Sequence, residues 1–136
     1  MNGLIVDTNI LFAALRSEAS LTRRQLLKQT VPLYAPNYII GELFNHQSRW
    51  LSKGKSSSAQ TTEFMFKLMS KITFINEAQI STPNFIAAYR LCRGIDENDT
   101  PFVALSLELG CPFWTRDEKL KTGLIKAGFR NFYEES

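Results

Sequence analysis

The stretch that decides the fold is residues 3–15, GLIVDTNILFAAL. It opens with a short apolar run rich in β-branched residues, passes through one carboxylate, Asp7, and continues with apolar residues at helical spacing. This pattern predicts a buried strand, an acidic side chain at its end and a helix that follows at once.

The same alternation returns along the rest of the chain. Further strands are expected at residues 33–35, 72–75 and 112–115, with a last short one at 131–133. Helices are expected at residues 21–29, 36–51, 60–71, 82–93, 102–109 and 117–127, and a loop at 53–58. Strands that alternate with helices favour a three-layer α/β/α domain with a mainly parallel central sheet. Because no linker or internal repeat interrupts the pattern, residues 1–136 are expected to form a single domain.

The composition is that of a chain with a real core, since 44% of the residues are hydrophobic and 12% aromatic. Disordered and collagen-like chains are excluded by these values. The longest stretch without a charged residue, 29–41, is too short and too interrupted by proline to span a bilayer. The amino-terminal segment reaches Asp7 before a basic region and a long apolar region can form, so a signal peptide is not expected. We therefore expect a cytoplasmic protein with no membrane contact.

Cysteine and histidine are scarce. Cys92 and Cys111 form no CxxC pair, so a zinc site or a disulfide framework is not supported, and both thiols are expected in the core. His46 is the single histidine, and we expect it to be an ordinary surface or half-buried side chain. Most Ser-His-Asp and Cys-His centres are excluded on this ground.

Acidic residues stand where ligands collect in a parallel sheet, beyond the carboxyl ends of the strands and at helix N-termini. Asp7 and Asp117 follow predicted strands, Asp99 precedes a helix with Asp96 three residues before it, and Glu42 borders the apolar face of a helix. Each has a simpler explanation, as a helix cap for the aspartates or as a solvated residue for Glu42. Taken together, they are better explained by a hard divalent cation with oxygen ligands, and we predict a Mg²⁺ or Mn²⁺ site.

Four segments together resemble the PIN domain, the metal-dependent ribonuclease fold that includes the VapC-type toxins of toxin-antitoxin modules. They are IVDTN (5–9), IIGEL (39–43), IDENDTPFVALSLELG (95–110) and PFWTRDEKL (112–120). The resemblance covers essentially the whole chain. It implies an endoribonuclease that uses one or two Mg²⁺ or Mn²⁺ ions to hydrolyse RNA phosphodiester bonds.

The resemblance also implies the roles of individual residues. The catalytic and metal-binding acids would be Asp7, Glu42, Asp99 and Asp117. Asn9 and Thr115 would be polar groups beside them. Asp99 matches the family's third acid because it directly precedes a helix, which leaves Asp96 as an auxiliary ligand or a charge at the rim.

The distribution of basic residues is consistent with a nucleic-acid substrate. The chain carries a net charge of +3, and setting the four pocket acids aside makes the remainder more positive by four charges. Phosphate contacts from basic side chains position a nucleic acid without reading its sequence. The residues expected to make such contacts are Arg23, Arg24, Lys28, Lys53, Lys55, Arg116 and Lys119. The alternative is an ordinary solvated surface.

The resemblance to toxins implies a small antitoxin protein as a partner. Apolar residues in the helices at 39–51 and 64–69 could leave a groove for an amphipathic partner helix, or they could cover the core or join two copies of the chain. A non-catalytic PIN fold that binds RNA or acts as a scaffold is the alternative function, because a fold does not determine an activity. A phosphatase of the haloacid dehalogenase type is disfavoured, since Asn9 stands where it would need a second aspartate.

Overall fold

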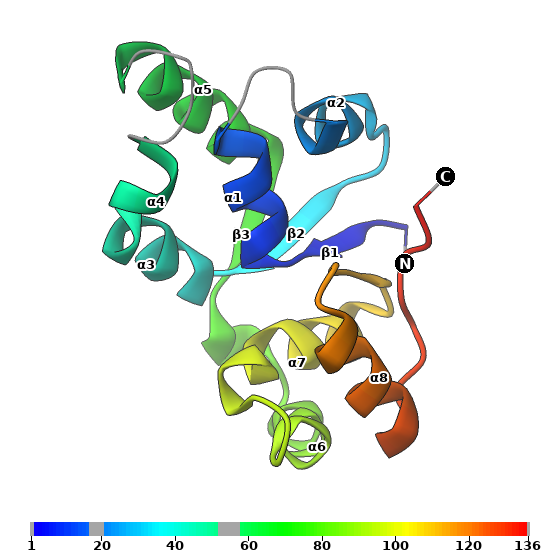
Figure 1. Ribbon diagram of the computed structural model, residues 1–136. Helices are drawn as coiled ribbons and strands as arrows, with labels where there is room; N and C mark the ends of the chain where they lie inside the picture. Colours follow the sequence, from blue (N-terminus) through cyan, green and yellow to red (C-terminus); the bar gives the residue numbers. More distant parts are fainter. Residues whose placement is uncertain (1, 17–20, 52–57, 136) are drawn as a thin grey trace.

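A four-stranded sheet forms the centre of the protein (Figure 1). The computed structural model describes residues 2–16, 21–51 and 58–135. The strands are β1 (Leu4–Val6), β2 (Leu33–Pro36), β3 (Ile72–Ile75) and β4 (Phe113–Trp114). All neighbouring pairs are parallel, in the order β3-β2-β1-β4, and Ile5 of β1 pairs with both Tyr34 and Phe113. The carboxyl ends of the strands therefore meet at one edge of the sheet.

Helices cover both faces of this sheet, which confirms the three-layer α/β/α prediction (Figure 1). One layer contains α1 (Thr8–Arg16), α2 (Leu21–Lys28), α4 (Gln47–Leu51) and α5 (Ser58–Lys71). The other contains α6 (Thr82–Cys92), α7 (Thr100–Leu109) and α8 (Glu118–Ala127). Helix α3 (Tyr38–Asn45) follows β2 directly, and the short 3₁₀ helices are η1 (Glu77–Gln79) and η2 (Glu97–Asp99).

The core lies between the sheet and its two helical layers. Phe102 of α7 stacks on Phe113 of β4 with ring centroids 5.9 Å apart, and both rings are fully buried. Helix α7 ends as expected, at Gly110 in the left-handed conformation, where glycine avoids the steric cost of a side chain. The free thiols of Cys92 and Cys111 are buried, as predicted.

Two expectations from the sequence were wrong in detail. The single helix expected at 36–51 is interrupted at His46, which separates α3 from α4. The indole N–H of Trp50 donates to the carbonyl of Leu43 (2.8 Å) and so satisfies an acceptor that a continuous helix would bond along its own axis. The strand expected at 131–133 is only a backbone bridge between Phe132 and Phe113.

The loop expected at 53–58 lies almost entirely outside the described residues, and Ser58 is already the first residue of α5. None of the helices in the described ranges is long and apolar enough to cross a membrane.

Candidate active site

The predicted acids come together at the carboxyl edge of the sheet. Asp7 follows β1, Asp117 lies just beyond β4, and Glu42 lies on α3, which follows β2. They line a small cavity of about 200 Å³ together with Asp96 and Asp99. The other lining residues are Thr8, Asn9, Phe12, His46 and Asn98.

Asp7 is held by the sheet and by α1 at the same time. Its backbone N–H donates to the carbonyl of Trp114 (3.0 Å), and its own carbonyl accepts from the N–H of Ile10 (3.1 Å) at the start of α1. Only 4% of the residue is exposed. Burial raises the pKa of Asp7 to about 6, with smaller contributions from the charges of Glu42 and Asp117.

Two threonine hydroxyls orient the carboxylates of Asp7, which is buried, and Glu42, which is half-buried. The hydroxyl of Thr115 donates to Oδ2 of Asp7 (2.6 Å), and that of Thr8 donates to Oε1 of Glu42 (2.6 Å). Both threonines are buried. Hydrogen bonds to charged acceptors are the stronger kind, so each fixes one carboxylate oxygen in place.

Asp117 and Asp99 both precede helices, but they use their carboxylates differently. Oδ1 of Asp117 accepts from the N–H of Leu120 (3.0 Å) and caps α8, so the capping explanation holds for this residue. Asp99 makes no side-chain capping bond to α7. Burial raises the pKa of Asp99 to about 7, and repulsion from the other acids, Asp7 first among them, acts in the same direction. Its carboxylate is therefore committed to the cavity rather than to the helix.

Asp96 lies at the rim. It is exposed, and its Oδ1 accepts from the N–H of Asn98 (3.0 Å), which caps η2. Among the predicted polar neighbours, Thr115 contacts Asp7 and Asn9 is an exposed residue of the cavity lining.

Sequence reasoning missed three polar residues of the cavity: Thr8, His46 and Asn98. His46 is exposed, and its ring meets the edge of Phe12 with centroids 6.3 Å apart. It follows Glu42 by four residues, and this i, i+4 spacing would have placed both on the same side of a helix. Nothing in the sequence indicated a site role for Thr8 and Asn98 except that they are the sequence neighbours of Asp7 and Asp99.

The donor set fits a hard divalent cation. Five carboxylates and the amides of Asn9 and Asn98 surround the cavity, and none of the described residues that line it is a lysine or an arginine. Burial is the largest cause of the raised pKa values of Asp7 and Asp99, and the neighbouring acids add to it, so a bound cation would favour the charged form of both. Among the described residues, no three acidic, histidine or cysteine side chains are already arranged to hold an ion. The fit is therefore one of donor chemistry and charge.

The predicted basic residues differ in their burial. Arg23 is buried, its guanidinium donates to the carbonyls of Ala14 (2.7 Å) and Leu15 (3.3 Å), and it lies 3.7 Å from the ring centroid of Phe64. This corrects the expectation of a phosphate contact for Arg23, because the side chain fastens the end of α1. Exposed residues of the predicted set are Arg24, Lys28, Arg116 and Lys119. Lys53 and Lys55 lie outside the described residues.

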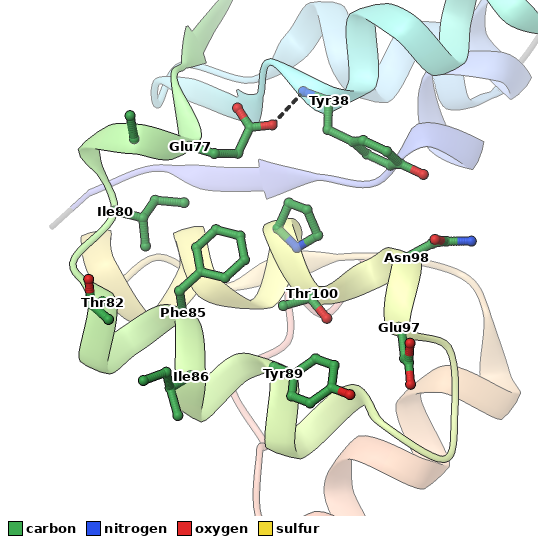
Figure 2. Close-up of a pocket in the computed structure, with 12 residues that line it drawn as sticks. Tyr38, Glu77, Ile80, Thr82, Phe85, Ile86, Tyr89, Glu97, Asn98 and Thr100 are labelled. Carbon is green, nitrogen blue, oxygen red and sulfur yellow. Dashed lines mark hydrogen bonds between the residues drawn. The ribbon is translucent and has the colours of Figure 1, made fainter.

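An apolar groove of about 820 Å³ runs beside the acidic cavity (Figure 2). Phe85, Ile86 and Tyr89 of α6 line one side of it, and Tyr38 of α3 lies across from them, with its backbone N–H donating to Glu77 (2.9 Å). Asn98 lines both the groove and the acidic cavity, so the two are adjacent.

The helices at 39–51 and 64–69, for which a partner groove, a role in covering the core and an interface between copies were all open, mostly cover the core. Their buried apolar residues are Ile39, Leu43, Trp50, Met65 and Leu68. Phe44 and Phe66 remain exposed on these helices, at 46% and 64%.

A match to a protein-family model shows which family this chain belongs to. A family model described as PIN domain matches residues 5–135. The chain belongs to the PIN-domain family.

Two solved structures share the fold of this PIN domain, each at 17% sequence identity. VapBC2 from Rickettsia felis, bound to a DNA fragment from its promoter, has a TM-score of 0.63 over 88% of this chain and 92% of the other. VapC20 from Mycobacterium tuberculosis, a sarcin-ricin loop cleaving toxin, has a TM-score of 0.58 over 93% of this chain and 95% of the other. A comparison with curated protein sequences found no match.

Proposed function

We propose that this PIN domain is a divalent-metal-dependent endoribonuclease that hydrolyses phosphodiester bonds in RNA. The observation that carries the proposal is the cavity lined by Asp7, Glu42, Asp99 and Asp117, with two raised acid pKa values and no lysine or arginine among its described lining residues.

The acids would hold one or two Mg²⁺ or Mn²⁺ ions in different ways. Asp7, Asp99 and Asp117 would bind the metal directly. Glu42 would bind it directly or through a water molecule, and Asp96 would be an auxiliary ligand. A bound divalent ion would supply a water of lowered pKa and offset the charge that develops on the phosphoryl oxygens. No histidine base is required for this chemistry.

The remaining polar residues orient the acids and the substrate. Thr115 and Thr8 hold the carboxylates of Asp7 and Glu42 before any ligand arrives. The amides of Asn9 and Asn98, at the exposed side of the cavity, can donate hydrogen bonds to a phosphate.

RNA is favoured as the substrate by the family and by the exposed basic side chains. Arg24 and Lys28 on α2 and Lys119 on α8 are available for phosphate contacts. Among the structures that share the fold, VapC20 is described as cleaving the sarcin-ricin loop.

We further propose that the protein is the toxin of a toxin-antitoxin pair, and that the apolar groove beside the cavity receives the antitoxin. The charged residues of this groove, Glu77 and Glu97, are acidic, and none of its described lining residues is basic. An amphipathic segment with a basic residue at its end therefore complements it, because the cation would reach the adjacent acids. A second copy of the chain is the alternative occupant.

The decisive experiment incubates the purified protein with a mixed RNA pool in Mg²⁺, Mn²⁺ or EDTA and sequences the cleaved ends. We expect cleavage with either ion, none in EDTA and none for Asp7→Asn. RNA binding without cleavage in every condition would support the non-catalytic alternative, and full cleavage in EDTA would overturn the metal-dependent mechanism.

A further inference from the structure

The segment that carries Thr115 and Asp117 to the site has no regular secondary structure. Residues 115–117 connect β4 to α8, and Arg116 lies between the two site residues. Two hydrogen bonds define the conformation of this segment. The N–H of Asp117 donates to the hydroxyl of Thr115 (3.2 Å), and the N–H of Leu120 donates to the carboxylate of Asp117 (3.0 Å).

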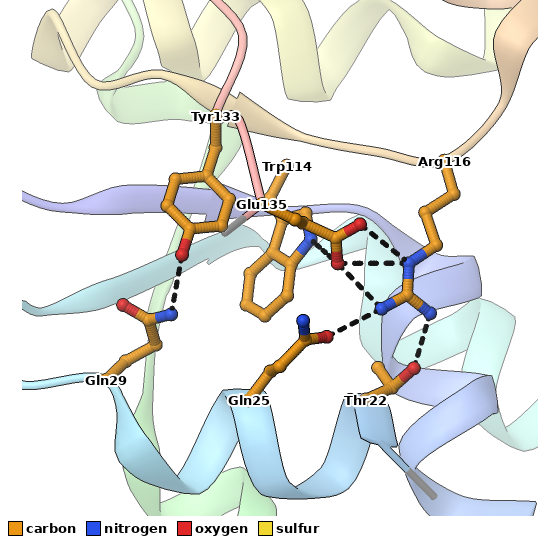
Figure 3. Close-up of polar contacts among 7 residues, drawn as sticks. All are labelled: Thr22, Gln25, Gln29, Trp114, Arg116, Tyr133 and Glu135. Atoms are coloured by element: carbon orange, nitrogen blue, oxygen red, sulfur yellow. Dashed lines mark hydrogen bonds and ion pairs between the residues drawn. The ribbon is translucent and has the colours of Figure 1, made fainter.

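The guanidinium of Arg116 ties this segment to two other parts of the molecule (Figure 3). It donates to both carboxylate oxygens of Glu135 through Nε (3.1 and 3.2 Å) and again through Nη2 (2.6 Å). It also donates to Gln25 (2.8 Å) and to the hydroxyl of Thr22, both on α2. Such forked pairing fixes orientation as well as distance.

The tail that supplies Glu135 is itself anchored to the edge of the sheet. The N–H of Phe113 donates to the carbonyl of Asn131, and the N–H of Tyr133 donates to the carbonyl of Phe113, each at 2.9 Å. The Tyr133 ring packs edge-on against Trp114 with centroids 5.1 Å apart, and the indole N–H of Trp114 donates to Glu135 (3.1 Å). Glu135 is thus held beside β4, within reach of Arg116.

We propose that Glu135 and Arg116 form a clamp that positions Thr115 and Asp117 for the acidic site. This inference rests on the proposed function for its biological meaning, but the geometry concerns the chain alone. Arg116 is a positioning residue in this arrangement. Its guanidinium is directed at Glu135 and α2, which is why it is better explained as a clamp than as the phosphate contact expected from the sequence.

Amide hydrogen exchange measured by NMR on the metal-free protein tests the clamp directly. The reporters are the N–H groups of Asp117 and Leu120, because each is bonded to a side chain of the segment. We expect exchange at both to be about two- to fivefold faster in Glu135→Gln and in Arg116→Gln than in the wild type, as for the loss of a partly exposed ion pair. The double variant should accelerate exchange by less than the product of the two single effects, because both single variants remove the Arg116–Glu135 pair.

Two controls separate the clamp from a general loss of stability. Glu134→Gln removes the same charge from the preceding residue of the tail and should leave the exchange rates of both reporters unchanged. The N–H of Ile5, which donates to the carbonyl of Pro112 within the sheet, should keep its exchange rate in all variants. Unchanged exchange at Asp117 and Leu120 in Glu135→Gln would overturn the proposal, and so would an equal acceleration at Ile5.

A Mn²⁺ titration and a kinetic measurement extend the test to the site. If the clamp positions Asp117, both variants should weaken Mn²⁺ binding by a similar factor and lower kcat with little change in KM. If Arg116 were instead a phosphate contact, Arg116→Gln would raise KM, Glu135→Gln would lower it, and the clamp would be wrong. A wild-type protein that neither binds Mn²⁺ nor cleaves RNA would contradict the proposed function, while the exchange rates would still decide the clamp.

Discussion

Thr115 donates a 2.6 Å hydrogen bond to Oδ2 of Asp7, which joins the ends of β4 and β1 through two buried side chains. We expect Thr115→Val, a nearly isosteric change, to remove this bond and to lower the free energy of unfolding at pH 8 by about 1.5 to 3 kcal/mol. Thr115→Ser keeps the hydroxyl and should cost less than about 1 kcal/mol. Urea unfolding of the two variants measures the difference, and equal stabilities would show that the bond contributes nothing.

The metal-free protein should become less stable as the pH rises from 5 to 8. The pKa of Asp7 is raised to about 6 and that of Asp99 to about 7, so the folded state holds protons that the unfolded state has released. The free energy of unfolding therefore falls as the pH rises through this window, and Asp7 accounts for about 1.4 kcal/mol of the fall, the equivalent of the one unit between pH 5 and its pKa of about 6. Urea unfolding in EDTA at several pH values tests this.

A variant identifies the group responsible for that slope. Asp7→Asn cannot ionise, so its stability should depend less steeply on pH than that of the wild type. A wild-type stability that stays flat or increases between pH 5 and 8 would contradict the raised pKa values.

Millimolar Mg²⁺ or Mn²⁺ should raise the melting temperature, because a ligand that binds only the folded state stabilises it. At a concentration 100 times the Kd the gain is about 2.7 kcal/mol. The effect should be larger at pH 8 than at pH 5.5, where protons compete for Asp7 and Asp99. Differential scanning fluorimetry measures this shift in melting temperature, with Asp99→Asn as the control. A melting temperature that neither ion changes would argue against a metal site.

The same substitution should lower protein stability at Arg23 and weaken RNA binding at Arg24. Arg23→Met deprives two buried carbonyls at the end of α1 of their donor and should cost about 2 to 4 kcal/mol of unfolding free energy. Arg24→Met, on the exposed side of α2, should change stability by less than about 0.5 kcal/mol. It should instead reduce the dependence of log K on log salt for RNA binding by about 0.7, the contribution of one phosphate contact to a single strand. Urea unfolding and fluorescence anisotropy provide the two measurements.

Antitoxin binding should depend on α6 rather than on α5. Ile86 and Tyr89 are exposed in the apolar groove at 46% and 45%, whereas Phe66 is exposed on α5 at 64%. We expect Ile86→Ser with Tyr89→Ser to weaken capture of the co-expressed neighbouring small protein at least tenfold, and Phe66→Ser to leave it unchanged. The reverse result would move the partner to the helices indicated by the sequence, and a shift from dimer to monomer in size-exclusion chromatography would identify a second copy as the occupant.

Much of the fold could be predicted because local sequence decides it. Residues 3–15 carry their own strand, carboxylate and helix signals, and the structure places β1, Asp7 and α1 there. The gathering of the acids at one edge also follows from local information, since parallel strands present all their carboxyl ends together.

What could not be predicted depends on partners distant in the sequence. Arg23 and Arg24 are chemically identical neighbours, and only the ring of Phe64, on α5, and the end of α1 distinguish the buried one. The break at His46 is a local feature, but the bond from the indole of Trp50 to the carbonyl of Leu43 that accompanies it is not visible in apolar periodicity.

The adjacency of β1 and β4 has a consequence for protein synthesis. Ile5 pairs with Phe113, so β1 is synthesised more than a hundred residues before this partner strand. Asp7 has neither Thr115 nor Asp117 beside it until that partner docks. The acidic cluster is therefore complete only once β4 has docked beside β1, so its assembly waits for one of the longest-range contacts of the fold.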